Sequence, residues 1–190
     1  RQQSLEFVEA QLTALKRYDI NALTASELID YKLIENLLLQ ERWDIETFKS
    51  WQWNPANYNV AGGFAQLINE NFAPLDERLR SFLARMENVP AYYAAAQDNI
   101  AQPTLEHTQL AIMQNKGAFS VFSDALLKQV AESGLTQQEQ ALFNERFKFA
   151  VAAIEQHIQW LTSLEAKLQK EGARSFRIGE ELYEQKFAFD

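Results

Sequence analysis

The chain has 190 residues, enough for one domain that buries a core of its own, and it contains no cysteine. The missing cysteines exclude a disulfide framework, a thiolate zinc site and a cysteine nucleophile. The net charge is −8, from 26 acidic and 18 basic residues, and no segment is strongly basic, which argues against a nucleic-acid-binding face.

The first two predicted elements are helices. Apolar residues recur at helical spacing from Leu5 to Leu15, which predicts a first helix of about four turns. Thr24 and Glu27 form a capping box, because the hydroxyl and the carboxylate can each accept a hydrogen bond from a free amide at a helix start. The second helix is expected to run to about Lys49, with a break near Asp44.

The passage Trp51-Gln-Trp-Asn-Pro-Ala-Asn-Tyr58 then interrupts the helical pattern. Pro55 lacks an N–H group and favours an extended Asn54, and asparagine itself favours turns. Trp51, Trp53 and Tyr58 offer too much apolar area for a free linker. We therefore expect a buried turn between two helical blocks.

Five more helical stretches follow this passage, and a proline or a capping residue marks most of their starts. We expect helices from Val60 to about Asn71, from Pro74, from Pro90, from Leu105 to about Ser133, and from Gln137 to Lys170.

Two glycines and a second capping box give further detail on where these helices begin, bend and end. Gly117 lies inside the expected helix from Leu105, where it predicts a close helix contact or a kink. Thr136 and Glu139 form the second capping box, at the start of the longest helix. Gly172 is a natural end for that helix.

The fold class that follows is all-α. No passage alternates as a strand does, so we expect a multi-helix bundle of about seven to nine helices, with one long central helix and no sheet. Residues 1–190 are expected to form a single helical domain. Because the segment from Gly179 ends while its pattern is still helical, we expect an N-terminal fragment of a longer protein. Neither a signal peptide nor a transmembrane span is visible in the sequence.

Few residues suggest a reaction. A catalytic zinc needs three ligands, and the only histidines, His107 and His157, are not part of a His-Glu-x-x-His pattern. We expect each at the surface or at the edge of the core. A nucleophilic serine motif and a phosphate-binding loop are also absent, so no catalytic residue and no metal ligand is assigned.

The aromatic passage is the remaining candidate. Trp51, Trp53, Asn54 and Tyr58 could face a substrate or a partner, or they could form the buried turn described above. Both interpretations stay open.

The order of several motifs resembles the N-terminal half of the bacterial DUF885 family, most clearly between Trp51 and Gly179. The motifs are Trp53–Tyr58, Asn71–Arg80, Ala84–Pro90, Asn99-Ile with Pro103, and Phe176–Tyr183 with Lys186-Phe187. The resemblance implies an all-helical protein similar to zinc metallopeptidases, often an exported lipoprotein. It also implies a His-Glu…Pro-Gly-His element in the C-terminal half, which this chain lacks, so no family ligand is carried over to any residue.

Three functions follow as hypotheses. The resemblance implies a non-catalytic helical half of a zinc-dependent peptidase-like protein that shapes or covers the substrate cleft. Its partners would be the C-terminal half of the same protein and a peptide substrate, its zinc would lie in that parent protein, and its location would be periplasmic or lipid-anchored. The alternatives are a helical binding or scaffold module and a non-enzymatic extracytoplasmic lipoprotein.

Overall fold

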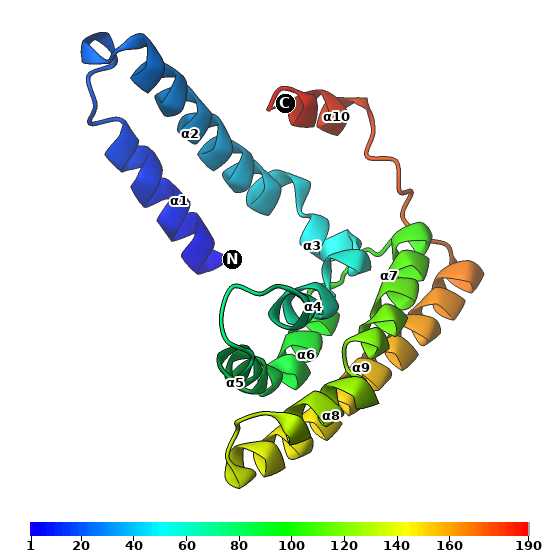
Figure 1. The fold of residues 1–190 in the computed structure, drawn as a ribbon. Coiled ribbons are helices and arrows are strands. Elements are labelled where there is room, and N and C mark those ends of the chain that lie inside the picture. Colours follow the sequence, from blue (N-terminus) through cyan, green and yellow to red (C-terminus); the bar gives the residue numbers. More distant parts are fainter. Residues whose placement is uncertain (190) are drawn as a thin grey trace. The chain divides into compact units, whose positions relative to one another are not determined.

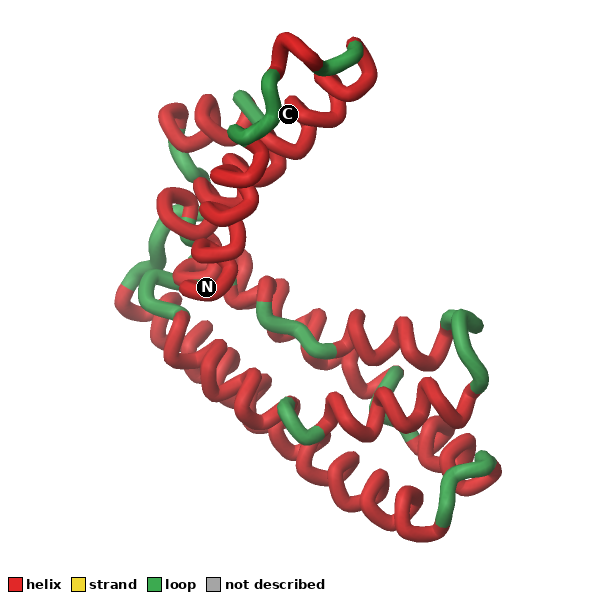
Figure 2. The backbone as a smooth tube through the Cα atoms, turned by 90° about the vertical axis from the view of Figure 1, so that its left-hand side faces the viewer, coloured by secondary structure: helices red, strands yellow, loops and turns green. Residues whose placement is uncertain are grey.

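The computed structural model describes residues 1–189, and these divide into two compact units. One unit contains Arg1–Trp51 and the segment from Arg177 onward, and the other contains Gln52–Phe176. Helices and loops account for the described residues, as Figure 2 shows, and no strand is present among them. The all-α prediction is confirmed. The prediction of a single domain remains a prediction.

The first unit is a helical hairpin with one added helix (Figure 1). Helices α1 (Gln2–Leu15) and α2 (Ala25–Trp43) pack on each other, and the short 3-10 turn η1 (Ile20–Ala22) lies between them in the chain. Helix α10 (Glu180–Phe187) binds α2 through the indole N–H of Trp43, which donates to Gln185 Oε1 at 2.7 Å. The buried apolar cluster of this unit is small and contains Val8, Leu12 and Leu38, and Tyr31 is also buried.

The break expected near Asp44 is present as a π-helical turn, η2 (Asp44–Phe48). The turn ends at Lys49, whose φ of 50° lies in the left-handed region. Lysine carries a Cβ and adopts this conformation at a cost, so the surrounding contacts must hold it there. The short helix α3 (Ser50–Trp53) follows and contains the boundary between the two units.

The second unit is built on the longest helix. Helix α9 (Gln137–Glu171) has 35 residues, and α5, α6, α7 and α8 all contact it. These elements and their neighbours are the 3-10 turn η3 (Pro55–Asn57), α4 (Ala61–Asn69), α5 (Leu75–Met86), α6 (Val89–Asn99), α7 (Leu105–Gly117), the 3-10 turn η4 (Ala118–Ser120) and α8 (Asp124–Glu132).

Aromatic rings form the centre of the second unit. Phe82 lies 4.5 Å from Phe64, 5.4 Å from Phe122 and 5.6 Å from Phe143, measured between ring centroids. Tilted and offset ring pairs of this kind stabilise a core beyond the area they bury. Helices α4, α5 and α9 and the connection before α8, which carries Phe122, therefore meet at one aromatic cluster.

The predicted helix starts agree with the structure. Both capping boxes are formed, with Glu27 N donating to Thr24 Oγ1 and Glu139 N donating to Thr136 Oγ1. Gly172, with a φ of 93°, ends α9 in a conformation that favours glycine.

The prediction of one continuous helix from Leu105 to Ser133 was wrong. It ends at Gly117 and is followed by a 3-10 turn, and α8 begins only at Asp124. Gly117 itself has a φ of −62° and nothing near the position that a Cβ would take, so neither a close contact nor a special conformation requires glycine. The Ser123-Asp124 helix start was the missed signal.

Candidate functional site

The segment from Gln52 to Tyr58 is fixed to the loop that precedes α7. The carbonyl oxygen of Gln52 accepts hydrogen bonds from the amides of Ala101 and Gln102, at 2.9 and 3.2 Å. The carbonyl oxygen of Trp53 accepts from the amide of Thr104 at 3.1 Å. Three bonds between segments about 50 residues apart in sequence hold this turn in one conformation.

The Trp53 side chain is a buried part of this turn. It is 6% exposed and meets the His107 ring edge-on, with 5.5 Å between the ring centroids. The guanidinium carbon of Arg174 lies 4.6 Å from the Trp53 ring centroid, within the range of a cation–π interaction. Trp53 thus joins the loop before α7 to the segment after α9, and it is placed as an internal anchor.

Asn54 and Tyr58 are half-buried at the two ends of η3. Asn54 Oδ1 accepts from the amide of Ala56 at 3.0 Å, which caps the turn as its sequence predicts. The carbonyl oxygen of Tyr58 accepts from Asn115 Nδ2 at 3.1 Å, and its ring lies edge-on to Tyr92 with 6.2 Å between the centroids. Tyr58 is thus partly exposed beside the exposed Tyr92 of α6.

Trp51 belongs to the other unit, so the four predicted site residues do not all fall within one unit. Its indole N–H donates to the carbonyl oxygen of Ile45 at 3.3 Å. The guanidinium carbon of Arg1 lies 3.6 Å from the ring centroid. Together with Lys49 these residues line a shallow pocket of about 630 Å³ within that unit.

A pocket beside Tyr92 in the second unit was not predicted from the sequence. It has a volume of about 280 Å³, and its lining includes Asn59, Gly63, Arg85, Asn88 and Tyr92. The Arg85 guanidinium donates to the carbonyl oxygen of Gly63 at 3.1 Å, which fixes the cation at the pocket wall. Tyr92 is 37% exposed whereas the adjacent Tyr93 is buried, as expected for neighbours on a helix.

Behind this surface lies a buried polar network. The Tyr93 hydroxyl donates to Asn115 Oδ1 at 2.6 Å, and Asn115 Nδ2 donates to the carbonyl oxygens of Ala111 and Tyr58. Burial raises the pKa of the Tyr93 phenol, so the hydroxyl stays a donor. The network connects the turn at Tyr58 to helices α6 and α7.

His157 is buried in the core, so the expected position at the surface or core edge was wrong for this residue. Its side chain is 1% exposed and lies between Tyr93 and Trp160, with ring centroids 4.2 and 5.6 Å away. Neither ring nitrogen has a hydrogen-bond partner among the described residues. Burial lowers the pKa of His157 to about 4, because the charged imidazolium is disfavoured away from water. His107 is half-buried at the edge, as predicted.

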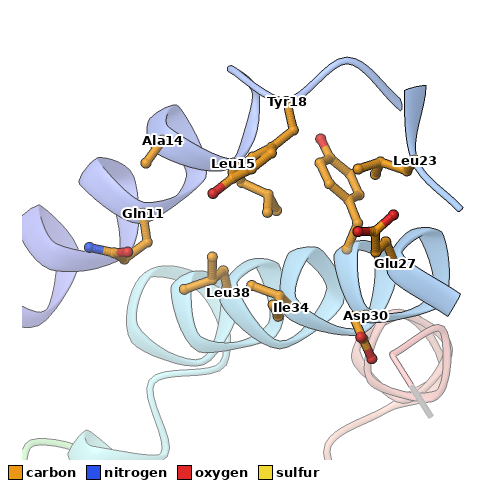
Figure 3. Close-up of a pocket in the computed structure, with 10 residues that line it drawn as sticks. Gln11, Ala14, Leu15, Tyr18, Leu23, Glu27, Asp30, Ile34 and Leu38 are labelled. Carbon is orange, nitrogen blue, oxygen red and sulfur yellow. The ribbon is translucent and has the colours of Figure 1, made fainter. Parts of the chain in front are cut away.

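The first unit contains a groove between α1 and α2 with a volume of about 390 Å³. Figure 3 shows Leu15 and Tyr18 on the α1 side facing Ile34 and Leu38 of α2, with Glu27 among the polar groups at the margin. The groove is mainly apolar, and no group in it forms a catalytic arrangement. Among residues 1–189, no three potential metal-ligating side chains lie close enough to hold an ion. None of the described helices combines the length and the apolar character needed to cross a membrane.

The sequence matches the pattern of the family described as bacterial protein of unknown function (DUF885) over residues 1–190. The chain belongs to the DUF885 family. No curated protein matches it. A solved structure, that of a "putative lipoprotein of unknown function" from Shewanella oneidensis, is similar to this DUF885 chain, with 68% sequence identity and a TM-score of 0.98. The match covers 99% of the present chain and 34% of that chain.

Proposed function

We propose that this DUF885 chain is the non-catalytic helical part of a longer zinc-dependent peptidase-like protein, in which it shapes or covers the substrate cleft. The observation that carries the proposal is the extent of the match. Nearly all of this chain corresponds to about a third of a much longer solved chain at high identity. The peptidase-like chemistry itself comes from the family resemblance alone.

The surface at Tyr58 and Tyr92 is the part of the second unit that suits this role. The half-buried Tyr58 and the exposed Tyr92 offer apolar faces with polar tips, a combination that is common where proteins bind peptides. The Arg85 guanidinium at the neighbouring pocket supplies a fixed donor for a carbonyl or carboxylate group. A peptide backbone and an apolar side chain would match these groups.

Zinc would be held outside this chain. The described residues contain no ligand cluster that fits it, so no step of the reaction is assigned to them. In a longer protein the metal would supply an activated water. The residues described above would bind and orient the substrate.

The test uses the protein encoded by the gene that contains this sequence. Its zinc content and its hydrolysis of a mixed peptide library are measured with the wild type and with a Tyr92→Ala variant. We expect about one zinc per protein and a several-fold higher KM for the variant, since the proposed substrate contact of Tyr92 is lost. Tyr183→Ala, an exposed tyrosine of the other unit, is the control and should leave KM unchanged. A zinc-free, inactive wild type would end the peptidase proposal.

A binding or scaffold module without catalysis is the second candidate, because the aromatic passage could hold a partner. Trp53→Ala separates the possibilities. Since Trp53 is buried against His107 and Arg174, we expect the variant to lose about 3–5 kcal/mol of unfolding free energy. A variant of wild-type stability that fails to bind a partner would instead support the module.

The third candidate is an extracytoplasmic lipoprotein with no enzymatic role. It is supported by the name of the Shewanella oneidensis protein, which describes a lipoprotein. We propose a periplasmic or lipid-anchored location on the same ground. Cell fractionation and detection of a lipid-modified N-terminal cysteine would test it, and a protein found only in the cytoplasm would contradict it.

A further inference from the structure

Helix α2 carries an apolar face that no described residue covers. The helix packs on α1 through Leu38 and binds α10 through Trp43. Ile29, Leu33 and Leu37 of the same helix are 60%, 63% and 65% exposed, so neither of these contacts covers them. Their spacing of four residues places them in one line along the helix. We call these three residues the outer stripe of α2.

The outer stripe continues onto α1. Phe7 is also largely exposed, and with Val8 and Leu37 it lines a shallow pocket of about 500 Å³ between the two helices. The apolar surface is therefore contiguous across the hairpin rather than a set of isolated side chains. Isolated exposed leucines are normal in soluble proteins, whereas contiguous apolar patches mark interaction surfaces.

The buried core of this unit is small, so the exposed stripe is a large part of its apolar surface. The buried cluster between α1 and α2 contains three apolar residues, and the exposed stripe contains as many apolar side chains as that cluster. A two-helix hairpin with so few buried contacts is marginally stable by itself. Covering the outer stripe would bury more apolar surface and would stabilise the hairpin.

The length of the similar solved chain indicates what covers it. Roughly two thirds of that chain lies outside the match, although the matched third is 68% identical to the present chain. We infer that the outer stripe of α2 is the docking surface for an amphipathic helix from the part of the family protein outside these 190 residues. The inference rests on the proposed function only in taking this chain as part of a longer protein.

The charges beside the outer stripe indicate which kind of helix would cover it. The exposed acids Asp30 and Glu41 lie on the flank of the outer stripe, and the whole chain carries a net charge of −8. A second copy would bring the same acidic flanks together, which is unfavourable. The docking helix is therefore expected to carry Lys or Arg beside an apolar stripe, so that its charges complement these two carboxylates.

The absence of cysteine in this chain permits a direct test. Single variants Leu33→Cys and Lys32→Cys are made in the protein encoded by the gene and are labelled with a maleimide. The labelled α2 peptide is quantified by mass spectrometry, so thiols elsewhere do not interfere. Lys32 is the matched control, because it is exposed and is adjacent in sequence but lies on another face of α2.

We expect the thiol at position 33 to react about tenfold or more slowly than that at position 32 in the folded protein, and equally fast in denaturant. Equal rates in the folded protein would overturn the inference. Protection that disappears when a dimer is diluted to the monomer would assign the stripe to a second copy, which also overturns it. If Leu33→Cys fails to fold, Ile29→Cys on the same stripe gives the same comparison.

The labelling experiment and the enzymatic experiment can contradict their two proposals independently. Slow labelling in a zinc-free, inactive protein would support the docking surface and end the peptidase proposal. Fast labelling in an active zinc protein would contradict the docking surface and support the peptidase proposal. A gene product no longer than the present chain would remove the occupant and would overturn the inference at once.

Discussion

At the scale of the residue, the buried His157 makes the strongest physical prediction. An unfolded histidine takes up a proton near pH 6.5, whereas the folded protein holds the pKa of His157 at about 4. As the pH falls from 6.5 toward 4, the unfolded state binds this proton before the folded state does, so the free energy of unfolding decreases. His157 causes no such decrease above pH 6.5, and the decrease in the free energy of unfolding reaches about 3 kcal/mol at pH 4.

The His157→Phe variant tests this directly. It keeps a ring between Tyr93 and Trp160 but has no group that titrates, so the loss attributed to His157 between pH 6.5 and 4 should disappear. Urea unfolding at a series of pH values gives the free energy of each protein. The His107→Gln variant, which leaves His157 in place, should retain the loss. Identical pH profiles for the wild type and His157→Phe would contradict the assignment.

Arg78 is a second residue whose role depends on burial. Its guanidinium donates to the carbonyl oxygens of Leu67, Ile68 and Ala73 at 2.9 to 3.0 Å, and its side chain is itself buried. Two of these carbonyls lie in the last turn of α4, where a cation also favours the helix dipole. Arg78 therefore holds the connection from α4 to α5.

The Arg78→Met variant should lose about 3 kcal/mol of unfolding free energy, because it leaves buried carbonyl oxygens without a donor. Arg80→Met is the control on the same helix. Arg80 pairs with Glu139 at 2.6 Å but is exposed, so water screens the pair and its removal should cost much less than that of Arg78. Thermal or urea unfolding compares the two, and equal losses would show that the buried contacts of Arg78 contribute little.

At the scale of the element, the start of α9 is held by local contacts. Thr136 and Glu139 form the capping box, and Glu139 also accepts from Arg80 of α5. These contacts lower the pKa of Glu139 to about 2, chiefly through Arg80, so the carboxylate stays charged in mild acid. The cap and the contact between helices thus share one carboxylate.

The Thr136→Ala variant should destabilise the protein by about 1 kcal/mol, because a helix-start amide loses its side-chain acceptor. Thr136→Ser keeps the hydroxyl and should remain close to the wild type. Urea unfolding followed by circular dichroism measures both. A Thr136→Ser variant as unstable as Thr136→Ala would mean that the methyl group, not the cap, carries the effect.

The caps also explain how much of the fold the sequence could predict. Thr24, Thr136 and Gly172 act within a few residues, so their effect is visible in the sequence alone. The break between α7 and α8 was missed because Phe119, Phe122, Leu126 and Val130 keep helical spacing across it, and all of them pack in or against the core. An apolar period reports which face is buried, and it does not report whether the backbone remains helical.

The candidate site shows the same limit. His157 is spaced three residues from Ile154 and four from Leu161, both buried, but the expectation of a surface or core-edge position did not use this spacing. Its Tyr93 neighbour comes from α6, and no local pattern indicates that contact. The pocket beside Tyr92 was missed for this reason, since Gly63, Arg85 and Tyr92 come from three different helices.

At the scale of the whole molecule, the two units differ in what holds them. The buried cluster of the first contains three apolar residues, whereas the second has a larger apolar core that joins α4, α5, α8 and α9 with their connections. Local opening is governed by the number of buried contacts that must be broken. The hairpin of α1 and α2 should therefore open at a lower free energy than the unit built on α9.

Native-state hydrogen exchange would measure this difference. In the 190-residue chain, amides of α1 and α2 should exchange faster than those of α9 between Ala150 and Leu161, where the helix is most deeply buried. The Leu38→Ala variant should accelerate exchange only in the first unit, because Leu38 belongs to the smaller core. Uniform exchange in both units, or acceleration by Leu38→Ala throughout, would instead indicate one cooperative domain. In a longer family protein with the outer stripe covered, the α2 amides should exchange more slowly, which links this measurement to the proposed docking surface.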